Sequence, residues 1–89
     1  MKDKEWQIEV IKLNPWCELN GKNCTIKSTV GHHFISKGAS EKLRDDLDNG
    51  IGLCHSCHIL IHIKSGTKAM IINKRGNNWY NNLNKKRYA

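Results

Sequence analysis

Four cysteines, grouped as two pairs in a chain of 89 residues, constrain this sequence more than any other feature. Cys17 and Cys24 lie in a polar stretch, and Cys54 and Cys57 have the Cys-x-x-Cys spacing. A chain this short buries only about 60% of its unfolded surface, so its core is marginal without a cross-link or a metal. Four thiolates are enough for a closed tetrahedral zinc site, which would clip the N-terminal loop to a later helix.

Whether the cysteines bind a metal or form disulfides depends on the cellular compartment of the protein. Residues 2–5 are all charged and precede no apolar run. The longest apolar stretch, 59–63, is interrupted by His62 and is far too short to span a bilayer. We therefore expect a cytoplasmic protein without membrane contact, where reduced thiols favour metal binding over disulfides. Asn20 stands where a second Cys-x-x-Cys would place its thiol, and Cys24 follows seven residues after Cys17. Buried free thiols, or a disulfide formed only on oxidation, therefore remain alternatives.

The charge of the chain is divided unevenly. The formal net charge is +7, yet residues 1–48 carry eight basic and eight acidic side chains, and the last acid is Asp48. A one-sided basic excess attracts polyanions, of which nucleic acid is the commonest. A merely soluble basic surface is the alternative. The candidate contacts to a phosphate backbone are Lys64, Lys68, Lys74 and Arg75.

Apolar periodicity predicts a small α+β domain. Residues 5–13 are apolar and indicate a short helix or strand that Pro15 ends. The composition of 29–35 and of 51–53 predicts two short strands, separated by a polar segment. In that segment Leu43 and Leu47 are spaced for one helical turn against the core.

Helices are expected after the second strand. Leu60, Ile61 and Lys64 continue a three- and four-residue periodicity that predicts a helix over 54–65, with Gly66 as its C-cap. The tail, 67–88, predicts one or two more helices broken at Gly76. Their shared apolar face comprises Ile72, Trp79 and Leu83.

The histidines are grouped rather than scattered. His58 and His62 lie four residues apart on the expected helix, so both rings project from one face and can grip one ion. His32 and His33 are adjacent on the expected strand and point to opposite sides. One of them can therefore be a third ligand while the other approaches a substrate. His55 lies between two cysteines, is expected to face solvent and has no assigned role.

The order of these motifs is more specific than any one of them. Gly31-His32-His33-Phe34, then Asp48-Asn49-Gly50, then Cys54-His55-Ser56-Cys57-His58 and His62, resembles the ββα-metal core of HNH endonucleases over about residues 15–66. His62 is similar to the added imidazole of bacterial DNase toxins, and the stretch 43–58 is similar to small phage-encoded HNH proteins. The resemblance implies a single domain over 1–89, with a zinc-stapled core of two antiparallel strands and a metal-binding helix, followed by a basic helical extension, 67–89.

The resemblance also implies a role for each site residue. His33 matches the general base that takes a proton from the attacking water, and Asn49 matches the residue that ties the strands and orients that base. His32, His58 and His62 match the ligands of one catalytic divalent ion, and the four cysteines match a structural zinc. The expected reaction is hydrolysis of a DNA phosphodiester, giving 5′-phosphate and 3′-hydroxyl ends.

The resemblance defines the identity of the metal and of the substrate less narrowly than the site residues. The catalytic ion would be Mg, Mn, Ni or Zn, and an all-imidazole site should bind Ni, Zn, Mn or Co better than Mg. The expected substrate is double-stranded DNA, held through the basic C-terminal half; specificity, oligomeric state and biological role stay open. The alternatives are a non-catalytic zinc-stabilised module that binds nucleic acid, a nuclease for RNA or branched junctions, and an inactive structural subunit. The His spacing after Cys57 does not fit a zinc finger.

Overall fold

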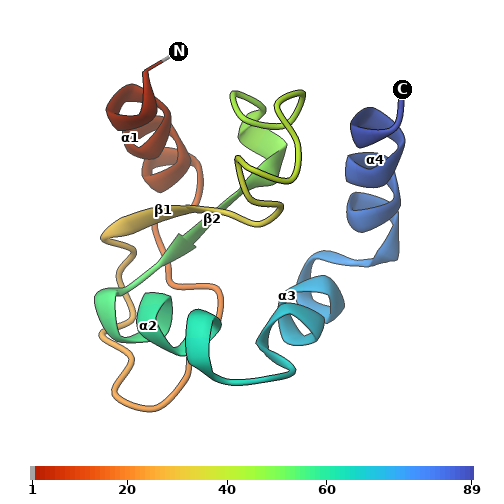
Figure 1. Cartoon of the computed structure of the whole chain (residues 1–89). Coiled ribbons are helices and arrows are strands. Elements are labelled where there is room, and N and C mark those ends of the chain that lie inside the picture. Colours follow the sequence, from red (N-terminus) through yellow and green to blue (C-terminus); the bar gives the residue numbers. More distant parts are fainter. Residues whose placement is uncertain (1) are drawn as a thin grey trace.

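The chain is organised around a two-stranded antiparallel sheet with a helix on each side (Figure 1). The computed structural model describes residues 2–89, and Met1 lies outside the described part. The expected α+β class, with two short antiparallel strands and additional C-terminal helices, is confirmed. The elements are α1 Asp3–Leu13, β1 Val30–His33, β2 Gly50–Leu53, α2 His55–Ile63, α3 Thr67–Arg75 and α4 Asn77–Arg87.

The register of the sheet separates the two adjacent histidines. His32 pairs with Ile51, and His33 pairs with Gly50. Paired residues of antiparallel strands point to the same face, and neighbours along a strand point to opposite faces. One face of the sheet therefore carries His32 and Ile51 toward α2, whereas the other carries His33 toward α1.

The face toward α1 is made almost entirely of glycine. Gly31 pairs with Gly52, and Gly50, two residues before Gly52 in the sequence, lies on the same face. A Cβ at Gly50 would collide with the side chain of Val10, and a Cβ at Gly52 would collide with the carbonyl oxygen of Asn14. The absence of side chains at these positions lets α1 approach the sheet backbone directly. The apolar segment 5–13 is thus a helix, one of the two expected alternatives.

The segment between the strands contains turns rather than the expected helical turn. Leu43 is fully buried, but Leu47 is only half-buried and begins a short 3₁₀ turn, Leu47–Asn49. The carbonyl of Leu43 accepts a hydrogen bond of 3.2 Å from the side chain of Asn49. The same carbonyl also accepts from the backbone N–H of Asp46 at 3.3 Å, so a three-residue turn rather than an α-helical turn follows Leu43.

The C-terminal elements correct one expected helix end. Helix α2 ends at Ile63, and Gly66, with φ of +86°, is the residue before α3 rather than a C-cap of the preceding helix. The left-handed backbone at Gly66 redirects the chain between the two helices. Gly76, with φ of +97°, separates α3 from α4 as expected. Within residues 2–89, none of the helices combines the length and apolar character needed to cross a membrane.

The helical tail completes the hydrophobic core beside β1. Leu83 is buried, and Ile72 and Trp79 pack against the core from α3 and α4, so the expected shared apolar face is present. The ring of Phe34 meets Trp79 edge-to-face at 5.0 Å and Tyr80 at 6.1 Å. Trp79 and Tyr80 therefore both pack against the core.

Candidate functional site

Three of the predicted site histidines converge across the interface of β1 and α2. The Nε2 atoms of His58 and His62 lie 3.3 Å apart on consecutive turns of α2. The ring centroid of His32 is 5.2 Å from each of the other two. One nitrogen of each ring lies within 4.8 Å of the others. Nitrogens that ligate one ion at about 2.1 Å in tetrahedral geometry lie roughly 3.4 Å apart, so small ring rotations suffice for the three to share an ion.

The surroundings of this cluster favour the neutral form of the imidazoles, which is the form that binds a metal. Burial, followed by the nearby charges of His58 and His62, lowers the pKa of His32 to about 4. Burial is also the main cause that lowers the pKa of His58, with His62 next. His32 is therefore neutral near pH 7 and offers a lone pair. A metal ligand must be deprotonated, and protons compete weakly at this ring.

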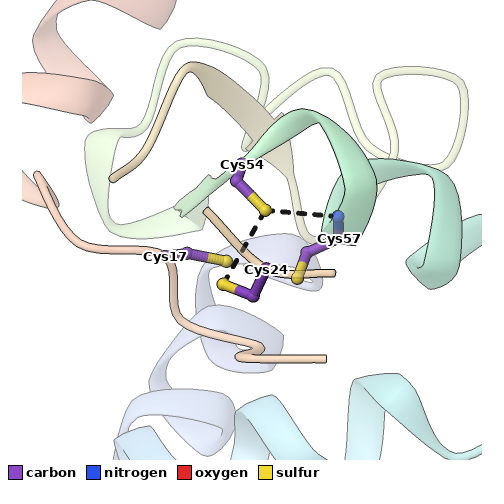
Figure 2. A group of neighbouring side chains, drawn as sticks. All are labelled: Cys17, Cys24, Cys54 and Cys57. Atoms are coloured by element: carbon purple, nitrogen blue, oxygen red, sulfur yellow. Dashed lines mark hydrogen bonds between the residues drawn. The ribbon is translucent and has the colours of Figure 1, made fainter. Parts of the chain in front are cut away.

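The four cysteines form a second cluster (Figure 2). Cys17 and Cys24 come from the loop between α1 and β1, Cys54 is the N-cap of α2, and Cys57 lies in its first turn. The sulfur atoms of Cys24 and Cys54 are 3.8 Å apart. All four cysteine sulfur atoms lie within 4.8 Å of one another. Thiolates around a tetrahedral zinc, at about 2.3 Å from the ion, are also about 3.8 Å apart. The cluster is thus geometrically suitable for a structural metal such as zinc.

Backbone N–H groups point at the sulfur atoms, which favours thiolates. Gly21 donates to Cys57 Sγ at 3.3 Å, and Ile26 donates to Cys24 Sγ at 3.3 Å. Burial raises the pKa of Cys54, but hydrogen bonds led by the backbone of Thr25 outweigh it and lower the pKa to about 6. Burial raises the pKa of the Cys57 thiol. One sulfur is therefore an easily formed thiolate, and a bound cation would be what deprotonates the others.

The loop that carries the first cysteine pair explains its unusual spacing. Three non-glycine residues have left-handed backbone: Asn20 with φ of 51°, Asn23 with 63° and Ile26 with 73°. Asparagine tolerates this conformation, but a β-branched residue at positive φ is strained by about 1–2 kcal/mol. Ile26 is held there because its carbonyl accepts a hydrogen bond of 2.6 Å from the backbone N–H of Cys17. Asn20 and Asn23 lie among the six positions between the two cysteines, and Ile26 follows Cys24, so the tight turns of this loop bring Cys24 to the other sulfurs.

His33 lies on the opposite face of β1 in a distinct environment. Its ring stacks on Trp6 with centroids 3.6 Å apart and an interplanar angle of 4°. Its Nε2 is 2.9 Å from the carbonyl oxygen of Arg44. A carbonyl only accepts hydrogen bonds, so Nε2 carries the proton and donates it, and in the neutral ring Nδ1 retains its lone pair. The contact therefore selects the tautomer in which Nδ1 can act as a base.

Sequence reasoning missed the part that Trp6 plays. Trp6 was expected only to contribute to an apolar segment, but it is fully buried and forms the surface on which the His33 ring rests. Its Nε1 donates to the carbonyl oxygen of Asp46 at 3.3 Å. The apolar character of 5–13 indicated only a helix or strand, because a contact between residues 27 positions apart leaves no local signal.

One hollow joins His33 to the three-histidine cluster. A cavity of about 280 Å³ is lined by residues from both faces of β1. His33 reaches it from the α1 side, and the cluster reaches it from the α2 side. The lining includes His32, His33, Ser36, Lys37, His58 and His62.

Asn49 occupies a central, fully buried position. Its Oδ1 accepts from the backbone N–H of Ile35 at 2.8 Å, and its Nδ2 donates to the carbonyl oxygens of Ile35 at 2.9 Å and Leu43 at 3.2 Å. Its own carbonyl accepts from the N–H of Phe34 at 2.9 Å. Asn49 thus joins the residues that follow His33 to the residue that begins β2. It holds the backbone on which His33 sits without touching the ring.

Arg75 is not available as a phosphate contact, which corrects the expectation from its sequence position. Its Nε is 2.6 Å from Glu18 Oε1, and its Nη2 donates to Asn14 Oδ1 and to the carbonyl oxygen of Gly50. Both side chains of the Arg75–Glu18 pair are mostly buried. This arginine ties α3 to the cysteine loop and to β2, so its charge is used inside the fold.

The other basic side chains of the C-terminal half differ in whether they form ion pairs. Lys86 forms ion pairs with Asp46 at 2.9 Å and Asp48 at 3.0 Å, so acids from the first half of the chain neutralise part of the basic half. His55 is exposed between the cysteines, as expected. The predicted phosphate contacts that stay exposed are Lys64, Lys68 and Lys74.

Comparisons with protein-family models, with curated proteins and with solved structures found no match for the chain. A function of the chain is therefore inferred from the geometry and chemistry of the site itself.

Proposed function

We propose that the chain is a metal-dependent endonuclease of the HNH type that hydrolyses phosphodiester bonds in DNA. One observation carries the proposal. Three imidazoles suited to one ion share a hollow with a fourth imidazole, His33, whose hydrogen bond to a carbonyl leaves Nδ1 free. A metal site beside an independent base is an arrangement that can hydrolyse a phosphodiester.

The first step assigned to this chain is proton removal. His33 Nδ1 would accept a proton from a water in the hollow as that water attacks phosphorus. The stack on Trp6 and the hydrogen bond to Arg44 fix the ring in two directions, so little reorganisation accompanies proton transfer. Asn49 supports this placement through the backbone of Phe34 and Ile35.

The three-histidine cluster would hold the catalytic ion. His32, His58 and His62 supply three ligands from one side, and the hollow leaves the opposite side open to a substrate oxygen. Three protein ligands with an open position are typical of catalytic rather than structural ions. When bound, the ion supplies charge stabilisation for the phosphate and the leaving oxygen.

Two further features support the HNH assignment. The order β1, β2, α2, with His32 and His33 on the first strand and two ligands on the helix, matches the ββα-metal arrangement that the motifs resemble. The cysteine cluster fixes the N-terminal end of the same helix, as a structural zinc would. Exposed lysines next to the cluster provide positive charge for the nucleic-acid backbone, and Lys68 is near enough to help lower the pKa of His32.

The decisive experiment is cleavage of supercoiled plasmid. Purified protein is incubated with Mg, Mn, Ni or Zn, and the same reactions are repeated with EDTA. We expect metal-dependent nicking that EDTA and His33→Ala both abolish, while the His33→Ala protein still binds metal and DNA. His55→Ala removes an exposed histidine outside the hollow and is the matched control, which should cut normally.

Two outcomes would count against the proposal. If unmodified protein binds DNA but never cuts it with any metal, the non-catalytic binding module becomes the better assignment. If cleavage survives in His33→Ala at an unchanged rate, the base lies elsewhere.

A further inference from the structure

A second hollow lies beside the histidine hollow and is not used by the proposed chemistry. Its volume is about 210 Å³, and Ser36 lines both cavities. Phe34, Ile72 and Tyr80 give it an apolar and aromatic wall, whereas Lys68 and Arg87 supply positive charge. The lining comes from the end of β1 and from α3 and α4, so residues far apart in the sequence form it.

Lys68 lines the second hollow and lies near the three-histidine cluster. Its Nζ is 5.7 Å from the centroid of the Phe34 ring, and its charge acts on His32 on the other side. Within residues 2–89, no carboxylate lies at ion-pair distance from Lys68 or Arg87, in contrast to Arg75 and Lys86. The charges of Lys68 and Arg87 are therefore not neutralised within the fold.

An aromatic wall with unneutralised cations has the chemistry of a nucleotide subsite. Unstacked bases pack on aromatic and apolar side chains, and the flanking phosphates pair with lysine and arginine. A base inside a continuous duplex has both faces covered by its neighbours, so it enters such a hollow only after unstacking and unpairing, whereas an unpaired base avoids that cost. We propose that this hollow binds one unpaired nucleotide of the strand that is cut, next to the scissile phosphate. The identity of the occupant depends on the proposed nuclease function.

The proposal changes the expected substrate. A plain duplex would fill the histidine hollow but leave the second hollow empty. DNA with an unpaired position, such as a bulge, a gap or a single-stranded segment, would fill both. We therefore expect a preference for unpaired positions rather than for the continuous duplex expected from charge and resemblance.

The test measures binding separately from cutting. Fluorescence anisotropy with the His33→Ala protein and Mn²⁺ compares a continuous duplex with the same duplex carrying a one-nucleotide 2-aminopurine bulge. We expect the bulged DNA to bind about tenfold more tightly, which is the scale of one base stack. Quenching of 2-aminopurine on binding would report that the base packs against the protein.

Variants assign the preference to this hollow. Adding Lys68→Ala and Arg87→Ala should reduce binding of the bulged DNA to the level of the duplex. Lys42→Ala with Lys85→Ala removes two exposed lysines that do not line the hollow and should lower both affinities equally. Tyr80→Leu keeps an apolar side chain against Phe34 but removes the aromatic ring, so it should weaken quenching while far-UV circular dichroism stays unchanged.

The outcomes separate this inference from the proposed function. Equal affinity for the two DNAs, or a preference that survives Lys68→Ala/Arg87→Ala, would overturn the subsite. Inorganic phosphate is added as a competitor. If it weakens binding of the bulged and the continuous DNA to the same extent and removes the difference between them, the hollow is only an anion site, and the subsite proposal is overturned. Cleavage without preference would retain the nuclease and reject the subsite. Preference for the bulge without cleavage, when His33 is present, would retain the subsite and reject the nuclease.

Discussion

The cysteine cluster and the histidine cluster share one helix but have opposite surroundings. Cys54 and Cys57, at the start of α2, are fully buried, and their sulfurs belong to a closed set of four. His58 and His62, on the following turns, lie at the surface side of the same helix and belong to a set of three beside a hollow. Adjacent residues, Cys57 and His58, thus belong to different clusters.

The difference suits the two clusters on α2 to two different roles, and this contrast is the proposed division of labour. A closed four-ligand site leaves no position for a substrate, so an ion bound there would contribute to folding. An ion bound by the open three-ligand cluster would give less stabilisation but would keep a position for chemistry. Both clusters include residues of α2, so in this proposal a metal at the cysteines would also fix the helix that carries His58 and His62. Four variants test this contrast, beginning with the largest expected effect.

Cys57→Ser should prevent stable folding. It removes one of the four ligands, and a structural zinc contributes about 10 kcal/mol or more in small zinc-folded peptides. We expect loss of the cooperative thermal transition in circular dichroism and loss of bound zinc in elemental analysis. A strong chelator should have the same effect on the unmodified protein. A Cys57→Ser protein that melts like the unmodified one would show that the cysteines do not stabilise the fold through metal.

Asn49→Ala should be the next most damaging change. It leaves the N–H and carbonyl of Ile35 and the carbonyl of Leu43 without their side-chain partner in the core. The Leu43 carbonyl keeps the backbone N–H of Asp46 as a partner, but both Ile35 groups are left unsatisfied. Buried unsatisfied groups cost about 1–3 kcal/mol each, so we expect at least about 2 kcal/mol of destabilisation in urea unfolding. Asn78→Ala, at an exposed position of α4, is the control and should change little. Equal unfolding midpoints for the two variants would refute the bridging role.

Trp6→Phe separates positioning of the base from stability. Phenylalanine keeps an aromatic ring but loses the indole hydrogen bond to Asp46 and part of the surface under His33. We expect about 1–2 kcal/mol of destabilisation from the lost bond and volume, and about a tenfold slower cleavage. Plasmid cleavage and its pH profile are measured at a temperature where the variant is fully folded. Trp16→Phe changes an exposed tryptophan, 60% accessible, and should leave both unchanged. Normal cleavage by Trp6→Phe would assign Trp6 to the core alone.

His58→Gln should have the smallest effect on folding. The change removes one ligand of the open cluster, so we expect stability within about 0.5 kcal/mol of the unmodified protein, as for other changes near the surface. Calorimetric titration of the zinc-loaded protein with Mn²⁺ or Ni²⁺ should lose its binding event. His55→Gln, one turn away and exposed, should retain it. A large loss of stability in His58→Gln would contradict the proposed division of labour.

The elements of the fold could be predicted where the signal was local. The two strands, the helix after Cys54 and the break at Gly76 follow from periodicity and from glycine, which act over a few residues. The helical spacing of His58 and His62 likewise anticipated that the two rings meet. The structure adds that His32 reaches them from β1, although the roles of all three rings stay predictions.

The parts that could not be predicted depend on contacts between distant residues. The stack of Trp6 on His33 requires three glycines of the sheet to face α1, which only the register reveals. Arg75 looked like a free cation because its partner, Glu18, is 57 positions away. The end of α2 at Ile63 instead of the residue before Gly66 reflects how the chain turns into α3.

The long-range nature of the cysteine cluster has a consequence for how quickly the protein can fold. Cys54 and Cys57 can capture an ion while most of the chain is still unfolded, because they are close in sequence. Recruiting Cys24 then closes a loop of 30 positions, and such closure is the slow, entropically costly part of forming distant contacts. An ion bound by this cluster would therefore act as a reactant in folding. We expect the folding rate to rise with free zinc concentration, so that zinc supply sets how much newly made chain becomes native.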